Sequence, residues 1–271
     1  MTTEPNPSKH PIGVFDSGVG GLSILKALRA ELPHEDFVYV ADSGNAPYGE
    51  RDDAHVISRS RAITDYLRKQ HRISALVIAC NTATAAAIQL LRSEHPDLPI
   101  IGVEPALKPA LAQSQTRRIG VMATRGTLGS AKFKTLLESF AGQADFICQP
   151  CDGLADAIER DDTIKIIALC ARYTSGTGQF GINNGQIDTL VLGCTHYPFV
   201  RDILAKAVGA DIHLIDNGGP VARQTRRMLP RLANTDQAGD CVLLTTGTPA
   251  ALKDAAQRWL QLDCPVAALR I

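Results

Sequence analysis

The stretch SALVIACNTATA, from Ser74 to Ala85, places a cysteine between a short apolar run and a polar, helix-like continuation. The stretch DTLVLGCTHYPF, from Asp188 to Phe199, repeats this order of residue types in the second half of the chain. A short apolar run that leads into a helical pattern is typical of a parallel strand buried on both faces. The two stretches therefore predict two equivalent strand–cysteine–helix units.

Similar apolar runs recur along the whole chain, and each is followed by turn residues and then by a helical pattern. We expect strands at residues 12–15, 37–41, 75–79, 100–103, 119–122, 145–148, 189–193, 213–215 and 241–245. This alternation predicts an α/β fold of parallel sheets covered by helices on both faces. In such folds the carboxyl ends of the strands share one edge, and ligands bind there.

The chain also shows an internal duplication. IGVFDSGVGGL at 12–22 resembles IGVMATRGTLG at 119–129, and in each half this element precedes the cysteine unit. We predict two pseudo-symmetric parallel-sheet α/β domains with the active site in the cleft between them. The first comprises residues 1–104 and 212–271 and carries Cys80, and the second comprises residues 105–211 and carries Cys194. The segment GTGQFGINNGQ at 176–186 is predicted to be a loop.

The composition is that of an ordinary globular protein without a strong electrostatic field. The chain has 271 residues, 45% of them hydrophobic, and a formal net charge of zero, which does not favour nucleic acid or an anionic membrane. The one basic run, Arg223, Arg226, Arg227 and Arg231, has helical spacing and is interpreted as a solvated face. The N-terminal MTTEPNPSKH lacks the apolar segment of a secretory signal. We expect a cytoplasmic protein that binds neither nucleic acid nor a membrane, and whose seven cysteines are thiols.

Cys80 and Cys194 are the candidate chemical groups. Each follows an apolar strand and opens a predicted helix, whose macrodipole and free N–H groups favour a thiolate. The alternative is that both are small buried hydrophobic residues. If the two halves face each other, one thiol comes from each wall of the cleft. A planar carbanion between them can lose a proton to one side and gain one from the other, so the duplication predicts two-base chemistry that inverts a stereocentre.

Polar side chains at the ends of the other strands complete this hypothesis. Asp16 follows the first strand, where its carboxylate could meet a substrate ammonium group or orient a thiol, or could simply cap a helix. Thr124 occupies the matching place in the second half and could donate a hydrogen bond to a substrate carboxylate. His196 follows Cys194 by two residues and could protonate or polarise that site.

The loop ADSGNAPYGE at 41–50 is a further candidate for substrate binding. The hydroxyl group of Tyr48 and the N–H of Gly49 could bind a substrate carboxylate, although a plain turn explains the same residues.

The glycines after the first strand also allow a second hypothesis. Gly18-x-Gly20-x-x-Ser23 nearly matches a dinucleotide-binding fingerprint, with Asp42 following a second strand, which would indicate a nucleotide-dependent oxidoreductase. Ser23 stands where the third glycine belongs, and Asp16 would place negative charge beside the pyrophosphate. A third hypothesis is a non-catalytic binding protein with a two-domain cleft.

Cys148 and Cys151 form a C-x-x-C pair that is compatible with redox or zinc chemistry. Because the sequence offers no second pair and no neighbouring histidine, we predict no metal site here.

Taken together, DSGVGGLSIL, PYGE, ACNTATAAA, IGVEPA, LVLGCTHYP and IDNG resemble the glutamate racemases of the aspartate/glutamate racemase superfamily. The resemblance covers nearly the whole chain from Ile12 onward. It implies cofactor-independent interconversion of L- and D-glutamate, which supplies D-glutamate for peptidoglycan, without metal, pyridoxal phosphate or nucleotide. A related substrate such as aspartate is the alternative, since one methylene changes discrimination by only about 1–3 kcal/mol.

The resemblance also implies roles for individual residues. The two catalytic bases fall on Cys80 and Cys194, and Asp16 and His196 assist them. Substrate contacts fall on Asp16, Ser17, Tyr48, Gly49, Asn81, Thr82, Thr124, Thr195 and His196. An acidic residue of the family near the second thiol corresponds to Glu159, and we expect Cys80 to deprotonate the D enantiomer.

The expected partners are glutamate and a second copy of the chain in a homodimer. Some family members from Gram-negative bacteria are activated by a peptidoglycan precursor through an N-terminal extension. The short segment before Ile12 leaves that activation open for this chain.

Overall fold

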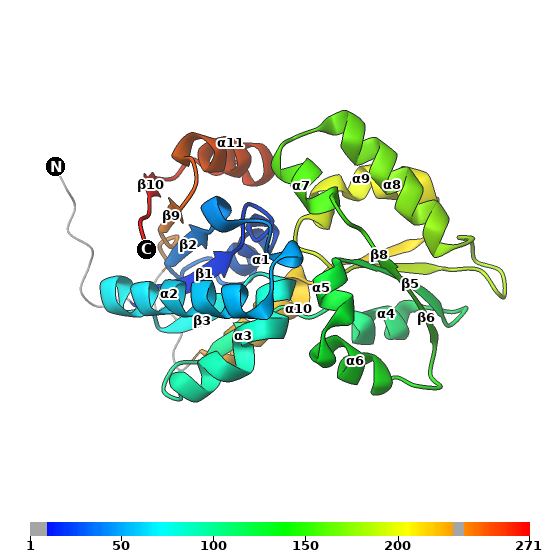
Figure 1. Cartoon of the computed structure of the whole chain (residues 1–271), viewed down its shortest axis with the longest axis horizontal. Coiled ribbons are helices and arrows are strands. Elements are labelled where there is room, and N and C mark those ends of the chain that lie inside the picture. The colour runs from blue at the N-terminus through cyan, green and yellow to red at the C-terminus, as the bar shows by residue number, and fades with distance from the viewer. Residues whose placement is uncertain (1–9, 230–235) are drawn as a thin grey trace.

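The structure, a computed structural model, describes residues 10–229 and 236–271 (Figure 1). Two parallel sheets organise it. The first contains, in spatial order, β10 (Val266–Ala268), β9 (Cys241–Thr245), β2 (Phe37–Ala41), β1 (Ile12–Asp16), β3 (Ala75–Ile78) and β4 (Ile100–Gly102). The second contains β6 (Asp145–Pro150), β5 (Arg118–Ala123), β7 (Thr189–Leu192) and β8 (His213–Ile215). All neighbouring strands are parallel, which confirms the predicted α/β class.

The first sheet is buried on both faces, as its unbroken apolar runs predict. Val14 and its neighbours on the adjacent strands face one core, and Phe15 and its neighbours face the other. One face is covered by α1 (Leu22–Glu31), α10 (Gly218–Met228) and α11 (Pro249–Leu260). The other face is covered by α2 (Asp53–His71) and α3 (Asn81–Glu94).

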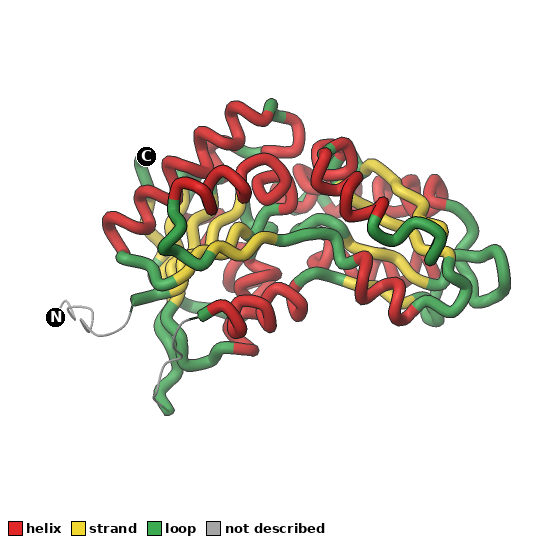
Figure 2. Tube along the Cα trace, turned by 90° about the horizontal axis from the view of Figure 1, so that it is seen from below, coloured by secondary structure: helices red, strands yellow, loops and turns green. Residues whose placement is uncertain are grey.

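The second sheet has the same layered plan. One face packs against α7 (Leu154–Glu159), α8 (Thr163–Thr177) and α9 (Arg201–Val208). The opposite face packs against α4 (Leu107–Gln113) and α6 (Ala131–Glu138), while the short α5 (Arg125–Gly129) follows β5. Figure 2 shows the strands of the two sheets as separate groups, each enclosed by helices.

The C-terminal part of the chain returns to the first sheet, because β9 pairs with β2. The limit predicted at residue 211 falls before β8, and β8 pairs with β7 in the second sheet. The second sheet therefore continues to Ile215, while the domain limits themselves remain a prediction. β10, which pairs with β9, was not predicted because its sequence, Val-Ala-Ala, contains a single residue that favours strands.

Smaller predictions can also be compared with the structure. The loop predicted at 176–186 begins at Gly178, because α8 continues to Thr177. Arg223, Arg226 and Arg227 form an exposed face of α10, and Arg231 lies outside the described residues. Within the described ranges, no helix combines the length and apolarity needed to cross a membrane.

Candidate active site

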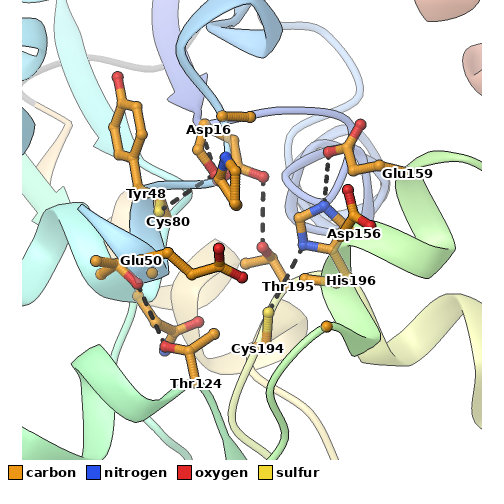
Figure 3. A pocket seen from close by; sticks show the side chains of 18 of the residues that line it. Asp16, Tyr48, Glu50, Cys80, Thr124, Asp156, Glu159, Cys194, Thr195 and His196 are labelled. Carbon is orange, nitrogen blue, oxygen red and sulfur yellow. Dashed lines mark hydrogen bonds and ion pairs between the residues drawn. The ribbon is translucent and has the colours of Figure 1, made fainter. Parts of the chain in front are cut away.

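A cavity of about 250 Å³ lies between the carboxyl ends of the two sheets. Its walls come from the segments that follow β1, β2 and β3 in the first sheet and β5, β6 and β7 in the second. Figure 3 shows side chains from both halves converging on this space. The cavity is lined by every residue that the sequence put forward for catalysis or substrate contact: Asp16, Ser17, Tyr48, Gly49, Cys80, Asn81, Thr82, Thr124, Cys194, Thr195 and His196.

Cys80 links β3 to α3 and caps the N-terminus of that helix. Its Sγ accepts a hydrogen bond from the N–H of Ala83 at 3.4 Å and lies 3.9 Å from the hydroxyl oxygen of Ser17. Burial raises the pKa of the Cys80 thiol well above its ordinary range, and the negative charge of Asp16 raises it further. The helix N-terminus alone was expected to favour a thiolate. Burial and Asp16 outweigh it, so Cys80 is held as a thiol.

Cys194 has different surroundings, although it occupies the equivalent place after β7. It is followed by the short 3-10 turn η3 (Tyr197–Val200), so the predicted α-helix, α9, begins only at Arg201. The Nδ1 of His196 lies 3.6 Å from its sulfur atom, and the Nε2 lies 2.7 Å from Oε1 of Glu159. Burial acts to lower the pKa of His196, but the hydrogen bonds to Cys194 and Glu159 raise it well above the ordinary range. The imidazole is therefore held as a cation, with its Nδ1 beside the sulfur atom of Cys194.

The glycine loop after β1 allows the second half of the chain to approach the first. Oε1 of Glu159 also accepts the backbone N–H of Val19 at 2.6 Å. A Cβ atom on Gly18 would lie 1.9 Å from that oxygen, and a Cβ on Gly20 would lie 2.3 Å from Nδ1 of His196. These glycines are therefore explained by the close approach of the Glu159–His196 pair.

Asp16 is fully buried beneath the same loop. Its carboxylate accepts the N–H of Ser17 at 2.8 Å and the N–H of Gly21, and it lies 3.4 Å from the hydroxyl of Thr195 in the other half. Burial raises the pKa of Asp16 to about 6, against the opposing charge of His196. Asp16 thus organises the loop, as a turn residue would, and it also lines the cavity, where its contact with substrate stays a prediction.

The dinucleotide-binding hypothesis does not agree with this geometry. The N–H groups of Ser17, Val19 and Gly21, which a pyrophosphate would need, donate to carboxylates of the protein itself. Asp42, the expected ribose ligand, is buried and accepts hydrogen bonds from Arg59, Tyr48 and Thr246.

The loop that contains Tyr48 and Gly49 presents its backbone to the cavity. The hydroxyl group of Tyr48 donates to Asp42 at 2.5 Å and points away from the two thiols (Figure 3), so its contact with substrate stays a prediction. Thr82 and Thr124 meet across the cleft, with their hydroxyl oxygens 3.4 Å apart.

The two cysteines of the C-x-x-C motif lie on opposite faces of the second sheet, because Cys148 and Cys151 pack into different cores.

Five charged residues of the wall, Glu50 and Arg160 among them, were not predicted. Arg125, Asp152 and Asp156 line the cavity, and Arg125 pairs with Asp152 at 2.5 Å. Their only sequence signal is that Arg125 and Asp152 follow Thr124 and Cys151 directly.

Ser23 was also missed as a bridging group. Its hydroxyl donates to the carbonyl of Thr195 at 2.7 Å and so joins the two halves.

The chain is similar to known proteins over most of its length. Residues 22–225 match the family model described as Asp/Glu/Hydantoin racemase. The chain is 45% identical to a glutamate racemase of Pseudomonas entomophila, over 95% of this chain and 97% of that protein. The crystal structure of a glutamate racemase from Bacillus anthracis superposes with a TM-score of 0.86 at 30% identity, covering 98% and 99% of the two chains.

A second solved structure is that of Escherichia coli glutamate racemase in complex with L-glutamate and the activator UDP-MurNAc-Ala. It superposes with a TM-score of 0.81 at 26% identity, over 96% of this chain and 97% of that one. Family model, sequence and fold thus agree over most of the chain, which belongs to the Asp/Glu/Hydantoin racemase family and, within it, to the glutamate racemases.

Proposed function

We propose that this enzyme interconverts L- and D-glutamate by a two-base mechanism in which Cys80 and Cys194 act from opposite walls of the cleft. The observation that carries the proposal is that the two thiols come from different sheets, line one cavity and have opposite electrostatic surroundings. His196 supplies a cation beside Cys194, whereas Cys80 has the carboxylate of Asp16 nearby. The resting site thus holds one base and one acid, as inversion of a stereocentre requires.

In the direction from L to D, the Cys194 thiolate removes the Cα proton and the Cys80 thiol delivers a proton to the opposite face. The enzyme is then left with a Cys194 thiol and a Cys80 thiolate, which is the form that deprotonates D-glutamate. A Cα–H is far less acidic than a thiol, so the carbanion must be stabilised by fixed donors in a site that excludes water. His196 holds a proton beside Cys194, and the carboxylate of Asp16 can accept one beside Cys80, so both groups can exchange protons with the thiols between turnovers.

The substrate ammonium and α-carboxylate are proposed to bind at the loops of Asp16, Asn81 and Thr195. Asn81 supports this, because its Nδ2 donates to the carbonyl of Val103 at 3.3 Å while its buried Oδ1 has no partner among the described residues. A buried acceptor without a partner is costly, and an ammonium group would satisfy it. The second carboxylate is placed at the backbone of Tyr48 and Gly49.

We also propose that the D-glutamate supplies peptidoglycan synthesis, on the strength of the family resemblance. The Escherichia coli relative was crystallised with an activator, but in this chain the N-terminal residues 1–9 lie outside the described part. The homodimer and the cytoplasmic location remain predictions.

The activity is tested by incubating the purified protein with L-glutamate in deuterium oxide without added cofactor. We expect optical rotation to decay to zero while deuterium from solvent enters Cα of the product. Retained rotation and protium at high enzyme concentration would contradict the proposed function. A parallel incubation with L-aspartate measures selectivity between the two substrates.

A further inference from the structure

Two cysteines lie side by side at the edge of the first sheet, away from the cleft. β10 pairs with β9 in parallel, with Val266 opposite Leu243. The carbonyl of Pro265 accepts the N–H of Leu243 at 3.0 Å, so the pairing continues before the first residue of β10. The same register places Cys264 opposite Cys241. Adjacent strands lie about 4.8 Å apart, within the Cα separation of about 4.4–6.8 Å that a disulfide spans.

The two side chains lie on the same face of the sheet. Cys241 belongs to the core under α1 and α11, and Cys264 packs against that core. Each thiol group acts on the pKa of the other. Cys241 is buried with 7% of its surface exposed, whereas Cys264 is half-buried and lines a surface hollow beside Lys253. One member of the pair is therefore open to a small reagent, and the other is reached only through it.

The charges around the pair give the two cysteines different reactivities. The neighbouring thiol of Cys241 lowers the pKa of Cys264, and the guanidinium group of Arg29 lowers it further, while Asp263 opposes this. The pKa of Cys241 is raised by its interaction with Cys264 and by burial. Because the thiolate is the nucleophilic form of cysteine, Cys264 is the attacking group and Cys241 the resolving one.

We propose that Cys241 and Cys264 form a dithiol that low-molecular-weight disulfides oxidise to an intramolecular disulfide. The Cys264 thiolate attacks one sulfur of the small disulfide, whose S–S bond breaks and releases one small thiolate. Cys241 then gives up its proton, and its sulfur attacks Cys264, releasing the second small thiolate. Two protein thiols are oxidised, the small disulfide is reduced to two thiols, and the two S–H protons pass to those thiols.

This site is separate from the catalytic one. Cys241 is the first residue of β9 and lies at the amino edge of the sheet, while Cys80 and Cys194 lie at carboxyl ends. The catalytic thiols come from different sheets and are both buried. Oxidation of the edge pair should therefore leave racemisation intact.

The test uses the reduced full-length protein with glutathione disulfide as the oxidant, followed by an acid quench, alkylation and peptide mapping. We expect loss of two hydrogen atoms per chain, a peptide pair joined through Cys241 and Cys264, and unchanged racemase activity. Reduction with dithiothreitol should restore both thiols. Bridging of a different pair, or no bridge while Cys264 carries glutathione, would overturn the proposal.

Serine variants separate the two roles. The Cys241→Ser variant should accumulate a stable glutathione adduct on Cys264, and the Cys264→Ser variant should leave Cys241 as a free thiol. The matched control is Cys170→Ser, which removes a buried thiol of the second half and should leave the bridge unaffected. Racemase activity reports folding of each variant. An unchanged loss of two thiols in the Cys264→Ser variant would contradict the assignment.

Discussion

Glu159 and His196 form a buried ion pair, with 2.7 Å between Oε1 and Nε2. The same Glu159 oxygen accepts the N–H of Val19, so one atom joins α7, the glycine loop and the imidazole. The pair raises the pKa of His196, and so keeps a cation beside Cys194, only when the two halves of the chain are close together. The approach of the two halves and the charge on this imidazole are therefore linked.

Replacing Glu159 with Gln should preserve the shape of this pair and remove its charge. Loss of a charge-assisted hydrogen bond costs about 1.5–3 kcal/mol, so we expect kcat/KM to fall about 10- to 100-fold. Because the equilibrium constant of a racemisation is unity, the fall must be equal for L- and D-glutamate. The alkaline limb of the pH–rate profile should move to lower pH, since the pKa of His196 is lowered. The control is Asp156→Asn on the same helix, whose carboxylate pairs with Arg160; an equal effect of both variants would contradict this role.

A methyl group on the glycine loop should disturb the imidazole. In the Gly20→Ala variant, the new Cβ would lie 2.3 Å from Nδ1 of His196, and one of them must move. Displacement by about 1 Å can reduce turnover about 100-fold, and we expect a loss of that order in kcat. The control is Gly129→Ala, whose Cβ would meet no atom within 4 Å. Near-normal kcat in the Gly20→Ala variant would contradict this prediction, because it would show that the loop tolerates a wider cleft.

Asp16 should make stability depend on pH in a direction unusual for a carboxylate. Its pKa rises from 3.8 in the unfolded chain to about 6 in the folded protein, which corresponds to about 3 kcal/mol. The folded state holds the proton more tightly, so this contribution is full below pH 3.8 and is lost as pH rises through about 6.

The Asp16→Asn variant removes this titration. Urea unfolding between pH 4 and pH 7 should show the variant gaining about 2.4 kcal/mol relative to the wild type as pH rises. A difference that stays constant over this range would mean that Asp16 keeps its ordinary pKa.

Tyr48 should matter for stability more than for substrate binding. In the Tyr48→Phe variant the buried Asp42 loses one charge-assisted donor, and we expect unfolding to become easier by about 1.5–3 kcal/mol. The KM for glutamate should change less than about threefold, because the hydroxyl group points away from the cavity. A large rise in KM without a loss of stability would contradict this prediction and show that the hydroxyl group contacts the substrate. In an Asp42→Asn background the cost of Tyr48→Phe should shrink, as the two residues interact directly.

The sequence predicted the sheets and the position of the site well, because buried parallel strands leave long apolar runs and their carboxyl ends share an edge. It could not predict β10, whose sequence contains a single residue that favours strands, or the pairing of β8 with β7 beyond residue 211. It also placed Cys80 and Cys194 in equivalent positions and predicted His196 beside Cys194, but it did not reveal the full difference in their surroundings. That difference depends on tertiary contacts, since Asp16 acts on Cys80, and His196 is held by Glu159 from another helix.

The most direct test of the two-base proposal is to follow each enantiomer of glutamate separately in deuterium oxide with the Cys80→Ala and Cys194→Ala variants. Neither variant should racemise, because each lacks the acid or base on one face of Cα. Any deuterium exchange with retention should be confined to L-glutamate in the Cys80→Ala variant and to D-glutamate in the Cys194→Ala variant. Racemisation at near wild-type rate by either variant, or exchange of both enantiomers by one of them, would contradict the two-base mechanism.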